Sequence, residues 1–152
     1  MMANRNLRKT LLGLVMAAVV LLPMLALPRP VLARPKRTII VLRSFARTTT
    51  TTTGAFDLGE EFDNCTVFLS VTAASGTTPT LDGKLQDSPD GALFFDIGSG
   101  TGAGTGNFTQ KTAAATDVKD INTRKIARYV RWVGTIAGTT PSFTYTVHIV
   151  VS

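Results

Sequence analysis

Few residues of this 152-residue chain have the type and spacing that catalysis requires. His148 is the single histidine, and a triad, a metal centre or a general base would need partners within reach of its ring. Ser99 lies in Gly-Ser-Gly, which lacks the outer frame of a nucleophile elbow. Asp87 and Asp90 belong to an Asp-Ser-Pro-Asp-Gly segment and are interpreted as turn formers. We therefore predict that the protein is not an enzyme.

Two further segments have compositions that ligand-binding loops share. Asp57, Glu60, Glu61 and Asp63 place four carboxylates close together, but without the alternating pattern of a calcium-binding loop. A solvated acidic loop is favoured over a metal site. Residues 98–106 read G-S-G-T-G-A-G-T-G, with no lysine and no helical pattern after them, which favours a hairpin tip over a phosphate-binding loop. No metal or cofactor is expected.

Aromatic residues on the polar side of strands are the strongest candidates for a binding role. Phe68 and Phe94 occupy outward positions of their predicted strands, between apolar residues that are predicted to point inward. Tyr129 shares its parity with Arg131. Exposed aromatic rings can stack on sugars or anchor a partner protein. We predict that Phe68, Phe94, Tyr129 and Arg131 form an interaction surface. The alternative is that they belong to a second packed face.

The strands that must position these residues are marked by alternation of apolar and polar side chains. The clearest stretch is 143–151, in which Phe143, Tyr145, Val147, Ile149 and Val151 share one parity. Residues 71–85 align without a gap on residues 133–147, 62 positions later, with Gly-Thr-Thr-Pro at the same place in both. Each copy is interpreted as a hairpin with Gly-Thr-Thr-Pro as its turn.

Other segments add shorter strands. Residues 38–45 and 64–73 are strong signals, and residues 107–111 and 115–121 are weaker ones. Residues 92–97 predict a strand with Leu93, Phe95 and Ile97 inward and Phe94 outward. Gly83 takes an inward position where a β-branched residue would be usual. Eight or nine short strands without helical periodicity predict an all-β fold, an antiparallel β-sandwich of jelly-roll type.

The first 33 residues have the organisation of a secretory signal peptide. A basic segment at 4–9 precedes an apolar run at 10–22, and Val31-Leu32-Ala33 supplies the small residues of a cleavage site. Cleavage between Ala33 and Arg34 would leave a basic linker at 34–37 and a domain at 38–152. An uncleaved membrane anchor and a start codon further downstream remain alternatives.

Charge and cysteine content narrow the classes of partner. Seven of the 16 basic residues lie in the first 37 positions, so nine remain against all ten acidic residues from Thr38 onward. The domain therefore offers no basic field, and no nucleic-acid partner is expected. Cys65 is the only cysteine, which excludes an intramolecular disulfide, and its apolar parity neighbours predict that it is buried.

A series of ordered motifs between residues 38 and 151 resembles a group of small phage and prophage virion proteins. The motifs are V-T-A-A-S-G-T-T-P-T-L-D, L-Q-D-S-P-D-G, F-F-D-I-G, F-T-Q, R-Y-V-R-W-V and G-T-T-P-S-F-T. The group consists of short β-sandwich structural proteins found among head and tail genes. The resemblance implies a capsid-, neck- or tail-associated component of the virion that acts in many copies through protein contacts.

A second hypothesis follows from the leader and the outward aromatic residues. An exported β-sandwich module, carbohydrate-binding or adhesin-like, would use Phe94 and Tyr129 together with a loop carboxylate to hold a glycan. Such a protein would be extracellular or periplasmic, and it would contact a membrane only through an uncleaved leader.

N-terminal sequencing of secreted material tests the leader. We expect the mature protein to begin at Arg34. A chain recovered only from membranes with its first 33 residues intact would contradict cleavage.

Overall fold

All regular structure in the described part of the chain is β-strand. The computed structural model describes residues 35–98 and 104–152, so the predictions for residues 1–33 and for cleavage between Ala33 and Arg34 lie outside it. Within these ranges no helix is long and apolar enough to span a membrane. The strands are β1 (Arg37–Arg47), β2 (Thr51–Thr52), β3 (Phe56–Asp57), β4 (Cys65–Ser88), β5 (Phe95–Asp96), β6 (Ala115–Ile121) and β7 (Tyr129–Val151). The predicted all-β, antiparallel fold is confirmed.

Two long strands form the centre of the sheet. β4 and β7 pair antiparallel from Cys65 opposite Val151 to Ser88 opposite Tyr129. β1, β2 and β3 follow one another along the free side of β7, and β5 and β6 lie along the free side of β4. The result is a ribbon about four strands wide.

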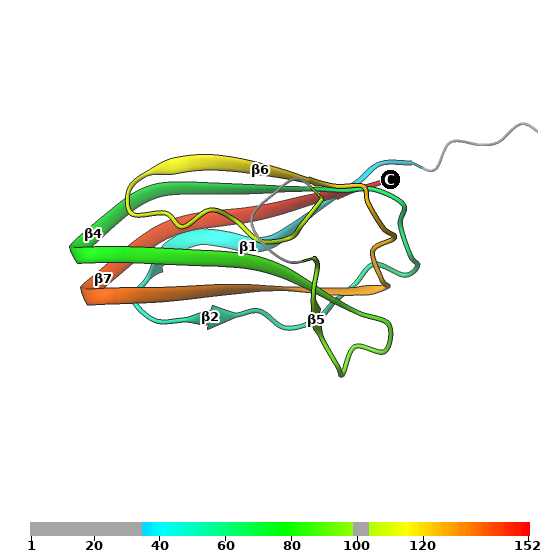
Figure 1. Ribbon diagram of the computed structural model, residues 1–152, viewed down its shortest axis with the longest axis horizontal. Coiled ribbons are helices and arrows are strands. Elements are labelled where there is room, and N and C mark those ends of the chain that lie inside the picture. The colour runs from blue at the N-terminus through cyan, green and yellow to red at the C-terminus, as the bar shows by residue number, and fades with distance from the viewer. Residues whose placement is uncertain (1–34, 99–103) are drawn as a thin grey trace, which may run out of the picture. The chain divides into compact units, whose positions relative to one another are not determined.

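The ribbon folds over on itself at the middle of its two long strands. Figure 1 shows β4 and β7 bending at the same end of the molecule, so that each contributes to two layers. The first layer contains β1, residues 142–151 of β7, residues 65–75 of β4, and β6. The second layer contains β2, β3, residues 129–137 of β7, residues 80–88 of β4, and β5.

The hairpin prediction for the two Gly-Thr-Thr-Pro repeats is wrong. Each repeat bends its strand without reversing it, and the residues on either side of the bend pair with the other repeat. Thr77 lies opposite Thr139, its own equivalent 62 positions later, so a local two-fold axis passes between them. The strand count is therefore seven in the described part, because the arms of each predicted hairpin form one continuous strand.

The two bends have the same backbone geometry, and we call this pair of bends the corner. A Cβ atom on Gly76 would lie 2.6 Å from the carbonyl oxygen of Thr140, and one on Gly138 would lie 2.7 Å from that of Thr78. Glycine is needed at both positions because the backbones touch. The positive φ angles repeat as well: 111° at Gly76 and 125° at Gly138, 48° at Thr78 and 47° at Thr140.

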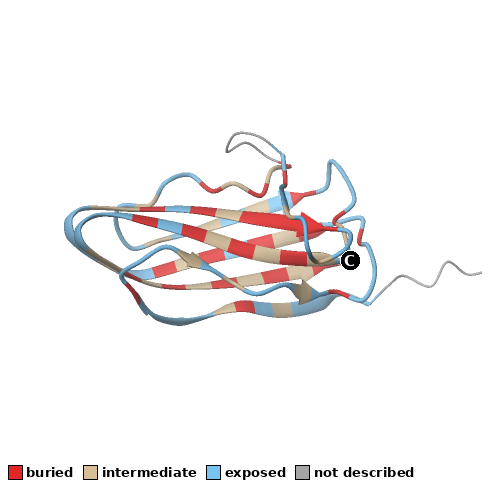
Figure 2. Ribbon diagram, turned by 90° about the horizontal axis from the view of Figure 1, so that it is seen from below, coloured by how far each residue is buried: buried red, intermediate tan, exposed pale blue. Residues whose placement is uncertain are grey.

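The core lies between the two layers, as Figure 2 shows by the alternation of buried residues along the strands. The apolar residues that share one parity in 143–151 are fully buried, as predicted, and so is Cys65. Burial raises the pKa of the Cys65 thiol to about 12. Trp132 of the second layer contacts Tyr145 of the first, with ring centroids 6.4 Å apart. Gly83 lies inward because the Trp132 ring occupies the position of a side chain there.

The segment from Asp90 to Ile97 differs from its prediction. Only Ile97 is buried, whereas Leu93 is 66% and Phe95 is 60% exposed. Asp90 forms the predicted turn, since its Oδ1 accepts hydrogen bonds from the backbone N–H groups of residues 92 and 93. That turn carries the chain outward before β5 begins, so β5 has two residues only. Residues 107–111 likewise form only isolated bridges to β4.

Asp87 is not a turn former but a buried anchor. Its carboxylate accepts a hydrogen bond from the Arg124 guanidinium at 2.6 Å and another from the backbone N–H of Ala127 at 3.0 Å. Both donors precede β7 in the chain. The carboxylate therefore fixes the end of β4 to the segment that leads into β7.

Substitution at the corner tests the two-fold equivalence. We expect Gly76→Ala and Gly138→Ala to lower the free energy of unfolding by similar amounts, about 1–3 kcal/mol each, because both add a Cβ atom at positive φ against backbone. Gly54→Ala is the control, since open space surrounds that residue, and its effect should stay within about 0.5 kcal/mol. Urea unfolding gives all three values. Unequal losses at the two corner positions would contradict the equivalence.

A second prediction concerns pH. Arg128 donates two hydrogen bonds to Asp57, at 2.8 and 2.7 Å, and the backbone N–H of Gly59 donates a third. The Arg128 bonds, followed by the Gly59 bond, lower the pKa of Asp57 to about 2. Because this value lies below the pKa of the unfolded chain, about 3.9, the carboxylate stabilises the fold above about pH 4 and loses this contribution as pH falls towards 2.

We therefore expect Asp57→Asn to flatten the acid dependence of stability. Thermal unfolding between about pH 5 and pH 2 should show a larger fall in midpoint for the wild type than for the variant. Parallel curves of unfolding midpoint against pH for the two proteins would show that the Asp57–Arg128 pair does not stabilise the fold.

Candidate interaction surface

Three exposed apolar side chains and one histidine lie side by side across the outer face of the first layer. Ile40 of β1 pairs with His148 of β7, His148 with Phe68 of β4, and Phe68 with Val118 of β6. Side chains of paired residues lie on the same face of a sheet. We call these four residues the apolar row. Ile40 is 51%, Phe68 41% and Val118 49% exposed, and His148 is half-buried.

The rows on either side of the apolar row are mostly polar and nearly uncharged. One consists of Thr38, Val150, Thr66 and Asp120, and the other includes Thr146, Ser70 and Thr116. Asp120 is the single charged residue among these side chains, and it accepts a hydrogen bond of 2.8 Å from the Thr66 hydroxyl. The outer face of the first layer therefore combines apolar side chains with hydroxyl groups. Such a face suits contact with another protein surface more than it suits chemistry.

The four residues predicted as one interaction surface fall into two places. Phe68 belongs to the apolar row, while Phe94, Tyr129 and Arg131 lie on the second layer. The Arg131 guanidinium covers the Phe94 ring at 4.2 Å and donates a hydrogen bond of 2.7 Å to Gln86. One face of the Phe94 ring is therefore already occupied.

Tyr129 is also part of a local cluster. The Arg128 guanidinium lies 5.1 Å from the centre of its ring, and the ring packs against Gly91 of the preceding turn. Arg128 is held in turn by Asp57. The cluster ties the turn at 88–91 to the start of β7, which is a structural use of the aromatic ring.

Ile40 and Val118 are members of the apolar row that sequence reasoning missed. The outward position of Val118 could have been predicted from the sequence. Val118 alternates with Thr116 and Asp120, whose polar side chains mark that parity as outward. The outward position of Ile40 could not, because Ile40 lies within the apolar run 39–42, where no polar residue marks one parity as outward.

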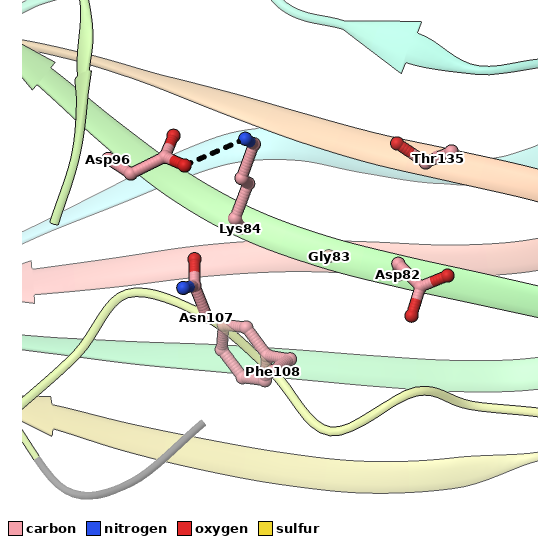
Figure 3. Close-up of a pocket in the computed structure, with 7 residues that line it drawn as sticks. All are labelled: Asp82, Gly83, Lys84, Asp96, Asn107, Phe108 and Thr135. Atoms are coloured by element: carbon pink, nitrogen blue, oxygen red, sulfur yellow. Dashed lines mark hydrogen bonds and ion pairs between the residues drawn. The ribbon is translucent and has the colours of Figure 1, made fainter. Parts of the chain in front are cut away.

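A polar depression lies on the outer face of the second layer, with a volume of about 310 Å³. Figure 3 shows that Lys84 points towards Asp96, with which it forms an ion pair of 2.9 Å. Asp96 also accepts a hydrogen bond from Gln86, and these bonds hold its pKa below the usual value. Asp82 accepts two hydrogen bonds from Gln110. Both carboxylates therefore have protein partners, and Phe108 at the base is buried.

No group of three or more histidine, cysteine, aspartate or glutamate side chains within residues 35–98 and 104–152 is arranged to hold a metal ion.

The comparisons with known proteins assign no family. No family model matches the chain, and no curated protein matches it. A solved structure of infectious bursal disease virus, Gx strain, contains a chain that superimposes with a TM-score of 0.45 at 12% identity. The superposition covers 77% of this chain and 31% of the viral chain, so the protein spans less than a third of the length of the chain it matches. A likeness at this level leaves the function to be argued from the molecule itself.

Proposed function

We propose that this protein is a non-enzymatic structural component of a virus particle, acting in many copies through protein contacts made by the outer face of its first layer. The observation that carries the proposal is the apolar row, in which three of four neighbouring strands present a large apolar side chain to solvent at the same level, and the fourth strand presents His148. Burying apolar surface stabilises an interface by about 25 cal/mol per Å². Several large apolar side chains exposed on one face are typical of a contact site.

The folded ribbon is consistent with this role. We infer that the two layers form a jelly-roll-like sandwich, because a four-stranded antiparallel ribbon bent at its middle produces that architecture. Of the six motifs that resemble phage virion proteins, F-F-D-I-G and F-T-Q lie at 94–98 and 108–110. The other four lie at the corner, in the turn at 87–91 and at the start of β7. They are thus the segments that shape the ribbon, and the resemblance supports a shared architecture as well as a shared role.

A binding role at Phe94 and Tyr129 has less support. A sugar would need an open aromatic face, and cations lie over both rings. We therefore place the contact surface on the first layer.

Particle occupancy tests the proposal. Cells that carry the gene with its native neighbours should yield particles that contain the protein, and Phe68→Ser should lower its amount in purified particles by about tenfold, because the substitution removes the largest apolar side chain of the row. Quantitative mass spectrometry of gradient-purified particles gives the occupancy.

Phe95→Ser is the matched control, since Phe95 is the more exposed of the two phenylalanines but lies on the second layer. Its occupancy should equal that of the wild type. A protein absent from every particle fraction and recovered only as a free chain would overturn the proposal.

A further inference from the structure

We infer that the outer face of the first layer packs against the same face of a second copy of this chain, across a two-fold axis that runs parallel to the strands. The inference rests on the proposed function and names the partner. From β1 to β6 the apolar row reads Ile40, His148, Phe68, Val118. Such an axis reverses the order of the row in the second copy. Ile40 of one copy therefore faces Val118 of the other, and His148 of one copy faces Phe68 of the other. Branched aliphatic side chains meet one another, and rings meet rings.

The distribution of charge also fits a second copy. The face carries Asp120 at one end of a row and Thr38 at the other end. The same axis places the Asp120 carboxylate of one copy opposite the Thr38 hydroxyl of the other, so that two carboxylates do not meet. A strongly charged partner would leave its own charges buried against threonine and aliphatic side chains, which is unfavourable. A face rich in hydroxyl groups, with Asp120 as the single charged side chain among the rows described, is matched by an identical face.

The size of the face indicates a weak pair. Four strands at about 4.8 Å spacing and about seven residues at about 3.3 Å each give a footprint of about 440 Å². Stable complexes bury about 800 Å² per partner. Two isolated copies should therefore associate weakly, and the contact gains strength when many copies are held close together, as they are in a particle.

Cysteine trapping detects such a contact without requiring a stable dimer. Ile40 and Val118 lie three strands apart, about 14 Å, which exceeds the roughly 7 Å that a disulfide can span. Neither position can therefore be bridged to the other within one chain. Cys65 is buried and does not compete.

The experiment uses the full chain in two single variants, Ile40→Cys and Val118→Cys, oxidised alone and as an equal mixture. The mixture should yield at least about five times more covalent dimer than either variant alone, because only the mixed pair brings two thiols together. Thr135→Cys, exposed on the outer face of the second layer, mixed with Val118→Cys gives the background of random collisions. Adding Phe68→Ser to both partners should reduce the mixed dimer to that background.

Two results would overturn the inference. Covalent dimers of Ile40→Cys with itself that exceed the mixed dimers would show a different axis. Mixed dimers no more abundant than the Thr135→Cys background would show that a second copy does not cover this face. In the latter case, particle occupancy that still depends on Phe68 would leave the proposed function standing with another protein as the partner.

Discussion

The backbone contact between the two Gly-Thr-Thr-Pro segments is the constraint on which the rest of the structure depends. Gly76 and Gly138 allow β4 and β7 to bend together while their pairing continues on both sides of the bend. A bend in one strand alone would break the ladder and leave backbone polar groups unpaired. Because both strands bend at equivalent residues, the ribbon folds as a unit, and its two halves can enclose one core.

The fold of the ribbon decides which side chains face inward and which face solvent. Trp132 fills the space between the layers because Gly83 beneath it has no side chain, and Tyr145 meets it from the opposite layer. The outward parity of the first layer is fixed by the same register. The proposed contact surface consists of the side chains that alternate with the core residues on these strands. A shift of one residue in either long strand would therefore turn them inward.

Local pattern was enough to predict the buried face of residues 143–151, the burial of Cys65 and the all-β class, because alternation depends only on neighbours in the chain. It was not enough to predict the partners of the strands. Gly-Thr-Thr-Pro has the composition of a hairpin turn. It bends the strand without reversing it only because the other Gly-Thr-Thr-Pro segment of the same chain lies opposite and pairs with it. The apolar row escaped prediction for the same reason, since Ile40, Phe68 and Val118 become neighbours only through pairing between distant segments.

The pairing of β4 with β7 also has a consequence for the order of folding. Cys65 pairs with Ile121 of β6 and with Val151 of β7, so the first half of β4 meets its longer partner only after β7 has been synthesised. Contacts between such distant residues close slowly because the loop entropy must be overcome first. The nascent chain therefore cannot complete its central ribbon until β7 has been synthesised, which leaves time for chaperones to engage it before it folds.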